Sequence, residues 1–224
     1  MIPWEHLDTA TMPDDGGDLR LMRRGSEYSI MSGSIELMNS RLSGSEEALA
    51  TLVCDRIGDR PRAKILIGGL GMGFTLRAAL KALKADAGVV VAELVPAVIA
   101  WAKSPLASVF EGSLDDPRVT VHQGDVGDLI RSSQSAYDAV LLDVDNGPEG
   151  LSRKANDGLY DPSGLAAARK ALRPGGVLAV WSSAPDVAFT RRLKRAGFTV
   201  EEVRVRANRA GRGARHVIWL ALKG

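Results

Sequence analysis

KILIGGLGMGFTL, residues 64–76, is the stretch of sequence that decides the fold. Its apolar start runs into Gly68, Gly69, Gly71 and Gly73, and a helical pattern follows at once. Glycine lets a turn adopt positive φ and lets a ligand lie directly against the backbone. The stretch therefore predicts a buried strand, a glycine-rich turn and a helix. Taken alone, the turn is either a binding loop for a cofactor or simply a tight connection.

A second apolar run, Val89–Ala92, ends at Glu93, which lies 22 residues after Gly71. An acidic side chain at the tip of the second strand is placed to accept hydrogen bonds from ribose hydroxyls. The glycine spacing is G-x-G-x-G, whereas a dinucleotide fold uses G-x-G-x-x-G to seat a pyrophosphate on the helix N-terminus. The shorter spacing is usual in folds that bind S-adenosylmethionine (AdoMet), which has no phosphate. We therefore expect a nucleoside-bearing cofactor, with Leu94 beside Glu93 in the same site.

Composition describes an ordinary globular protein. The 224 residues are 45% hydrophobic and 25% charged, with a net charge of +2, which suits one α/β domain with a small appendage. Cys54 is the only cysteine, so no disulfide forms within the chain and we expect a reducing, cytoplasmic location. The first residues do not resemble a signal peptide, and no apolar run approaches the ~20 residues that span a bilayer.

Charged and metal-binding side chains give weaker signals. His6, His122 and His216 are scattered and, with one cysteine, they show no metal-ligand spacing, so we expect no metal. Basic residues gather between positions 191 and 215. They form either a solvated surface or a contact for an anionic substrate or RNA, and the lack of interleaved aromatic residues favours the former.

The chain divides into residues 1–57 and residues 58–224. The first part has a loose, polar start up to residue 18, two or three short antiparallel strands within 19–42, and a helix over Ser45–Ile57 with Ser45 as its N-cap. The second part alternates strands and helices. We predict strands over Lys64–Ile67, Val89–Glu93, Val119–Gln123, Ala139–Asp143, Gly176–Ser182, Thr199–Arg206 and Arg215–Leu222. We predict helices over Thr75–Lys84, Pro96–Val109, Val126–Ser132, Pro162–Leu172 and Pro185–Ala196.

This alternation predicts a mostly parallel sheet with helices on both faces. The last two strands have no helix between them, so they form a hairpin in which one strand is antiparallel to the rest. A parallel sheet closed by such a hairpin distinguishes the AdoMet-dependent methyltransferase fold from a dinucleotide fold. The predicted fold class is therefore α/β, a Rossmann-like seven-stranded methyltransferase fold of strand order 3-2-1-4-5-7-6, with a short N-terminal β element.

The third strand ends in Gly124, Asp125 and Val126. Ligands of open α/β sheets bind beyond the carboxyl ends of the strands, so Asp125 is placed to accept from an adenine amino group while the next backbone N–H donates to a ring nitrogen. An N-cap role for Asp125 in the following helix would also explain it. Both roles stay open.

The fourth strand delivers Asp143 into a loop that contains Asp145 and Asn146. Neighbouring carboxylates raise each other's pKa unless a cation lies between them, and an amine substrate would relieve that repulsion. The alternative is an acidic surface loop capped by its own side chains.

Five motifs resemble the spermidine synthase family in content and order: GGLGMG, AELVPAVIAWA, the pair Gly124-Asp125, YDAVLLDVDNGP and LRPGGVLAV. The match covers roughly residues 64–182. The resemblance implies a methyltransferase-like fold that transfers an aminopropyl group from decarboxylated AdoMet to a diamine. It also implies that Glu93 holds the ribose, Asp125 the adenine, and Asp143 the reacting amine as base or orienter.

Two positions depart from that family's pattern. Gly71 stands where the family's glycine loop has an Asp that helps bind the aminopropyl amine. Asn146 stands where the strand-four loop has its second Asp, and Asp145 is a candidate replacement. Because an amine dication needs fixed negative charge around it, the cofactor half of the site is better supported than the acceptor half.

We therefore expect a spermidine synthase-like transferase that binds AdoMet or decarboxylated AdoMet and acts on a small amine, with no membrane contact. A homodimer is an assembly that the sequence allows. Two rivals stay open: an AdoMet-dependent methyltransferase acting on a small molecule or RNA, and a non-catalytic binder of AdoMet or a nucleoside. Tyr28 and Tyr160 are candidates either for lining the acceptor pocket or for ordinary packing.

Overall fold

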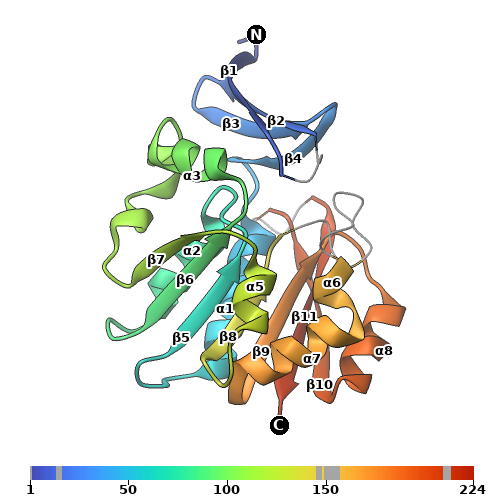
Figure 1. Ribbon diagram of the computed structural model, residues 1–224. Helices are drawn as coiled ribbons and strands as arrows, with labels where there is room; N and C mark the ends of the chain where they lie inside the picture. Colours follow the sequence, from blue (N-terminus) through green and yellow to red (C-terminus); the bar gives the residue numbers. More distant parts are fainter. Residues whose placement is uncertain (1, 14–16, 145–147, 149–156, 209–212) are drawn as a thin grey trace.

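Two β-sheets organise the chain (Figure 1). The computed structural model describes residues 2–13, 17–144, 148, 157–208 and 213–224. A four-stranded antiparallel sheet of order β1-β2-β3-β4 is followed by a seven-stranded sheet of order β10-β11-β9-β8-β5-β6-β7. The small sheet lies at the end of the large one where the parallel strands terminate, so it covers the edge at which α/β sheets bind ligands.

The small sheet is built from β1 (Glu5–Thr11), β2 (Asp18–Arg24), β3 (Glu27–Ser32) and β4 (Ile35–Asn39). The prediction of two or three strands within 19–42 is confirmed by β2, β3 and β4. The prediction of a loose start up to residue 18 is wrong, because β1 pairs with β2 along its length. A polar contact also anchors β1, since the indole Nε1 of Trp101 donates to Asp8 Oδ2 at 2.6 Å.

The large sheet has the predicted strand order 3-2-1-4-5-7-6. Its strands, in chain order, are β5 (Lys64–Gly68), β6 (Gly88–Glu93), β7 (Val119–Gln123), β8 (Tyr137–Leu142), β9 (Leu172–Ser182), β10 (Phe198–Arg206) and β11 (Arg215–Lys223). β5 pairs in parallel with β6 and β8, whereas β11 runs antiparallel to both β9 and β10. The closing hairpin that distinguishes the fold class is therefore present.

Helices cover both faces of the large sheet (Figure 1). They are α1 (Gly44–Ile57), α2 (Phe74–Ala82), α3 (Pro96–Lys103), α4 (Ala107–Phe110), α5 (Val126–Arg131), α6 (Asp157–Tyr160), α7 (Pro162–Ala171) and α8 (Val187–Arg195), with a 3₁₀ turn over Ser113–Asp115. Strand residues alternate between two cores: Ile65 and Ile67 pack with α1 and α2, while Leu66 packs with α5 and α7. The continuous apolar runs of the sequence arise because parallel strands are buried on both faces.

Two helix predictions need correction. The predicted helix over Pro96–Val109 is interrupted after Lys103, where the Ser104–Pro105 peptide bond is cis and α4 begins anew at Ala107. The predicted N-cap Ser45 instead lies inside α1, whose N-cap position is Ser43. Because α1 packs against α2 and β9, it joins the large sheet rather than the small one.

Asp138 fixes the start of β8, the strand that leads to Asp143. It sits where the pairing between β8 and β9 shifts register, and its carboxylate is buried. Oδ1 accepts from Arg60 at 3.0 Å, and Oδ2 accepts from Arg173 at 2.6 Å and from the backbone N–H of Lys64 at 2.8 Å. One carboxylate thus joins β5, β8 and β9.

Asp138→Ala removes both ion pairs and leaves the Lys64 N–H without its acceptor. Breaking a buried ion pair from one side costs about 3–5 kcal/mol, and both arginines here are partly exposed, so we expect the free energy of unfolding to fall by about 3 kcal/mol. Urea denaturation measures this. The control, Asp128→Ala, removes an exposed pair with Arg131 and should cost less than ~1 kcal/mol. Equal losses in the two variants would contradict the assignment.

Candidate functional site at the carboxyl ends of the parallel strands

The glycine loop and the end of β8 are in backbone contact. Gly68 closes β5, and its carbonyl accepts from the backbone N–H of Asp143 at 3.0 Å. Gly69 has φ +90°, and a Cβ there would lie 2.2 Å from the carbonyl oxygen of Asp143. Gly69 is therefore required on two grounds, its backbone conformation and the close approach of β8. The loop then passes Gly71 and Gly73 into α2.

Glu93 lies at the end of β6, as predicted, and is 8% exposed. Its Oε2 accepts from the backbone N–H of Leu70 at 2.9 Å, and its Oε1 accepts from Val95 at 2.8 Å. Burial raises the pKa of Glu93, and the surrounding backbone N–H groups, those of Val95 and Leu70 first, oppose that rise. Glu93 therefore orders the glycine loop and the turn at Leu94, and its contact with a ribose stays a prediction.

The N-terminal sheet reaches the glycine loop at Gly71. This residue has φ +49°, and a Cβ placed on it would lie 3.2 Å from the sulfur of Met38 in β4. Met38 is partly buried. A thioether therefore occupies the space beside the position at which the resembling family carries an Asp.

The end of β7 packs beside the same loop. The backbone N–H of Gly124 donates to the carbonyl of Glu93 at 2.9 Å, and a Cβ on Gly68 would lie 3.0 Å from the side chain of Val126. Asp125 caps α5, since its Oδ1 accepts from the Gly127 N–H at 2.7 Å. The capping role of Asp125 is confirmed, and its contact with adenine stays a prediction.

Asp143 follows β8 and lies on the α2 side of the strand ends. Its Oδ2 accepts from the hydroxyl of Thr75, in the first turn of α2, at 2.8 Å. Burial among the strand ends raises the pKa of Asp143 to about 7, repulsion from Glu46 adds to the rise, and the Thr75 hydroxyl opposes it. Burial thus favours the protonated form of this carboxyl relative to an exposed aspartate.

Glu46, in the first turn of α1, is the residue that the sequence analysis missed. Burial raises its pKa, and the Ser45 hydroxyl, which donates to Glu46 Oε2 at 2.6 Å, opposes that rise. Its backbone carbonyl lies 3.3 Å from the Thr75 hydroxyl that also bonds Asp143. No local signal in the sequence pointed to Glu46, because its place beside Asp143 depends on how α1 packs against α2.

The structure describes two of the four other residues that were predicted to bind the substrate. Tyr28 in β3 and Tyr160 in α6 are both buried, and the Tyr160 ring packs edge-on against Phe189 with a centroid distance of 5.6 Å. The structure gives each a packing role, so their contact with an acceptor stays a prediction. Asp145 and Asn146 lie outside the described residues.

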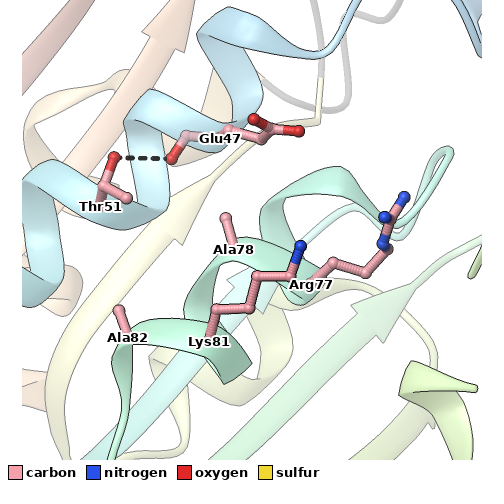
Figure 2. Close-up of a pocket in the computed structure, with 6 residues that line it drawn as sticks. All are labelled: Glu47, Thr51, Arg77, Ala78, Lys81 and Ala82. Atoms are coloured by element: carbon pink, nitrogen blue, oxygen red, sulfur yellow. Dashed lines mark hydrogen bonds between the residues drawn. The ribbon is translucent and has the colours of Figure 1, made fainter. Parts of the chain in front are cut away.

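A groove of about 330 Å³ lies between α1 and α2 (Figure 2). Its lining residues are Glu47, Thr51, Arg77, Ala78, Lys81 and Ala82, a set drawn from these two helices and not from the strand ends. In the described part of the chain, no three His, Cys, Asp or Glu residues are grouped to hold a metal ion. None of the helices described there is long and apolar enough to cross a membrane.

Comparison with known sequences gives consistent matches. A family model described as the spermine/spermidine synthase domain matches residues 45–191. The chain is 34% identical over 160 residues to the polyamine aminopropyltransferase of Mycobacterium tuberculosis, an alignment that covers 67% of this chain and 29% of that protein. It is 31% identical over 153 residues to polyamine aminopropyltransferase 1 of Streptomyces coelicolor, covering 65% and 28%. The chain therefore spans less than a third of the length of these two relatives.

Comparison with solved structures supports the fold. Spermidine synthase in complex with the transition state analogue AdoDATO matches with a TM-score of 0.75 and 19% identity, covering 98% of this chain and 72% of that one. Spermidine synthase from Thermotoga maritima matches with a TM-score of 0.76 and 18% identity, covering 98% and 73%. The likeness includes the N-terminal sheet, since nearly the whole of this chain is aligned.

The pKa of Asp143 gives a prediction about stability. Because the folded protein raises this pKa from 3.8 to about 7, it favours the protonated form, so the contribution of Asp143 is fully present below pH ~4 and is lost as pH rises toward 7. Asp143→Asn carries no such dependence. Its unfolding free energy relative to the wild type should therefore increase by on the order of 2–4 kcal/mol between pH 4 and pH 8. Urea denaturation across this range measures the difference, and parallel curves for the two proteins would refute it.

Proposed function

Because the chain belongs to the spermine/spermidine synthase family, we propose that it transfers an aminopropyl group from decarboxylated AdoMet to a small amine. The observation that carries the proposal is the place of Asp143, whose backbone contacts the glycine loop and whose carboxyl accepts from Thr75 beside that loop. A carboxyl at such a strand end, with a pKa raised by burial, is suited to proton transfer.

The donor half of the site is formed by the ends of β5, β6 and β7. Glu93 lies at the end of β6, where an acidic side chain is placed to accept from ribose hydroxyls, and the bare backbone at Gly69 and Gly71 allows a nucleoside to approach closely. Asp125 caps α5 through Oδ1, and its Oδ2, which lies 3.7 Å from the Arg131 guanidinium, is the oxygen that would accept from an adenine amino group. These residues fit a nucleoside donor without a phosphate.

The acceptor half is centred on Asp143. A bound sulfonium donor supplies an activated carbon, so the protein's task is to place the amine nitrogen in line with it and to manage a proton. The N–C bond forms as the C–S bond breaks, and Asp143 accepts the proton that the amine nitrogen gives up. Thr75, hydrogen-bonded to Asp143, fixes the orientation of that carboxylate.

Asp143→Asn tests this assignment. The amide keeps the shape and part of the hydrogen bonding but cannot accept a proton. We expect turnover of decarboxylated AdoMet with a panel of diamines to fall at least ~100-fold, as for the loss of a positioned base, while affinity for methylthioadenosine stays within about threefold. Turnover and calorimetric binding on the same preparations provide the measurement.

The wild type sets the reference for that experiment. Wild-type turnover in Asp143→Asn would remove Asp143 from the reaction. Tight binding of nucleosides by the wild type without turnover of any amine would instead favour a non-catalytic binding protein.

One observation favours a second candidate, methyl transfer from AdoMet. Among the described residues, the neighbour of a Cβ placed on Gly71 is the Met38 thioether, which carries no charge to hold the terminal ammonium of an aminopropyl donor. A methyl donor would not need that carboxylate for the group it transfers. The two candidates share the nucleoside site and differ in what surrounds Gly71.

Gly71→Asp separates the two candidates. Asp tolerates the left-handed backbone at this position, and its Cβ would displace only the flexible end of Met38 by a few tenths of an ångström. If the space beside Gly71 receives the aminopropyl group, affinity for decarboxylated AdoMet relative to methylthioadenosine should rise about tenfold, as for one charge-assisted hydrogen bond.

Gly71→Asn is the matched control, because it has the same size and backbone tolerance without the charge. Its preference between the two ligands should equal that of the wild type. An Asp variant that folds and binds methylthioadenosine but shows no gain would count against an aminopropyl group at this position.

A further inference from the structure

The hydroxyl of Ser45 links a side chain of the candidate site to the closing hairpin. Ser45 is fully buried in α1, where its Oγ donates to Glu46 Oε2 at 2.6 Å and lies 2.9 Å from Nδ1 of His216. His216 belongs to β11, and its ring packs edge-on against Trp181 at a centroid distance of 4.7 Å. Residues 171 positions apart in the sequence thus meet behind Glu46.

The number of protons available determines which group donates and which accepts in the contacts between His216, Ser45 and Glu46. A hydroxyl carries one proton, so when Glu46 is ionised Ser45 gives that proton to the carboxylate and can only accept from His216. His216 must then carry its proton on Nδ1. The imidazole holds the hydroxyl, and the hydroxyl holds the carboxylate.

The start of α1 is fixed on two further sides. The backbone N–H of Gly44 donates to the carbonyl of Ala207, just beyond β10, at 2.9 Å. The Thr75 hydroxyl lies 3.3 Å from the Glu46 carbonyl and 2.8 Å from Asp143 Oδ2. Glu46 therefore comes from a helix end held on two sides, and the Thr75 hydroxyl joins its backbone carbonyl to the Asp143 carboxyl.

We propose that His216 and Ser45 are positioning residues that hold Glu46 as a second carboxylate beside Asp143, so that the amine acceptor meets a pair of carboxylates. The inference rests on the proposed function and names a specificity residue for it. A primary ammonium group has three N–H donors, and two carboxylates satisfy more of them than one. Glu46 would thereby supply negative charge that Gly71 and Asn146 do not.

A purely structural reading is that acidic residues simply favour the first turn of a helix. That reading applies equally to Glu47, the next residue in the same turn, whose side chain lines the groove between α1 and α2 (Figure 2). Placing Glu46 near a second carboxylate is unfavourable for the empty protein, and a cation between them removes that cost. Glu47 is therefore the matched control.

The first measurement is steady-state turnover with 1,4-diaminobutane. Glu46→Gln should raise KM for the diamine at least tenfold while the affinity for methylthioadenosine stays within about twofold. Ser45→Ala and His216→Leu should raise KM by about three- to tenfold. His216→Asn places an amide donor where Nδ1 lies, so its KM should be close to that of the wild type. The control Glu47→Gln should also leave KM close to the wild-type value. A wild-type KM in Glu46→Gln, or equal effects of His216→Leu and His216→Asn, would overturn the proposal.

Two further measurements do not require turnover, so they test the positioning role of His216 and Ser45 even if the protein does not catalyse the proposed reaction. If the wild type binds an amine but does not convert it, calorimetric titration of the diamine in the presence of methylthioadenosine gives a dissociation constant for each variant. These dissociation constants then replace KM in the comparison. In that case the proposed function fails and the positioning role is still decided. If the wild type neither binds nor converts the diamine, both fail. The ¹⁵N shifts of His216 report its tautomer, and an Nε2–H tautomer in the amine-free protein at pH 8 would also overturn the inference.

Discussion

The contact between the backbones of β5 and β8 at their carboxyl ends underlies the whole site. The Asp143 N–H bonds the Gly68 carbonyl, and the next residue, Gly69, lies so close to β8 that even a methyl group would not fit. This contact places the glycine loop and Asp143, the proposed donor loop and acceptor carboxylate, at the ends of adjacent strands with their backbones in direct contact. The other elements of the site are arranged around that pair: Glu93 orders the loop from one side, and Thr75 and α1 approach Asp143 from the other.

Several carboxylates lie close together in the site, and their burial lowers the stability of the protein when no ligand is bound. Burial raises the pKa of Glu93, Asp143 and Glu46, and repulsion from Glu46 adds to the rise at Asp143. The buried carboxylate of Asp138, elsewhere in the same sheet, has different surroundings, because two arginines and a backbone N–H donate to it. Asp138 near the start of β8 and Asp143 just after its end thus have different surroundings, which fits a structural role for the first and the proposed ligand-binding role for the second.

Much of this arrangement could be predicted from the sequence because it depends on local signals. The strand order followed from the alternation of elements and the hairpin without an intervening helix, and the places of Glu93 and Asp143 followed from where apolar runs end. The features that the sequence did not predict depend on non-local contacts or have only a weak hydrophobic pattern. The strand β1 has only two partly buried positions, Leu7 and Ala10, and its anchor is an aspartate bonded to a distant tryptophan. The link from His216 to Glu46 depends on packing between the first helix and the last strand, which no spacing along the chain encodes.

The approach of Met38 to Gly71 has a consequence for how such proteins diverge. In the proposed site, the strand ends of the large sheet bind the ribose and the adenine, whereas the residue beside Gly71 comes from the small N-terminal sheet. A substitution in β4 would then change the space next to the transferred group without touching the residues proposed to bind the nucleoside. Donor selectivity and nucleoside affinity would thus be separable, because they depend on different sheets.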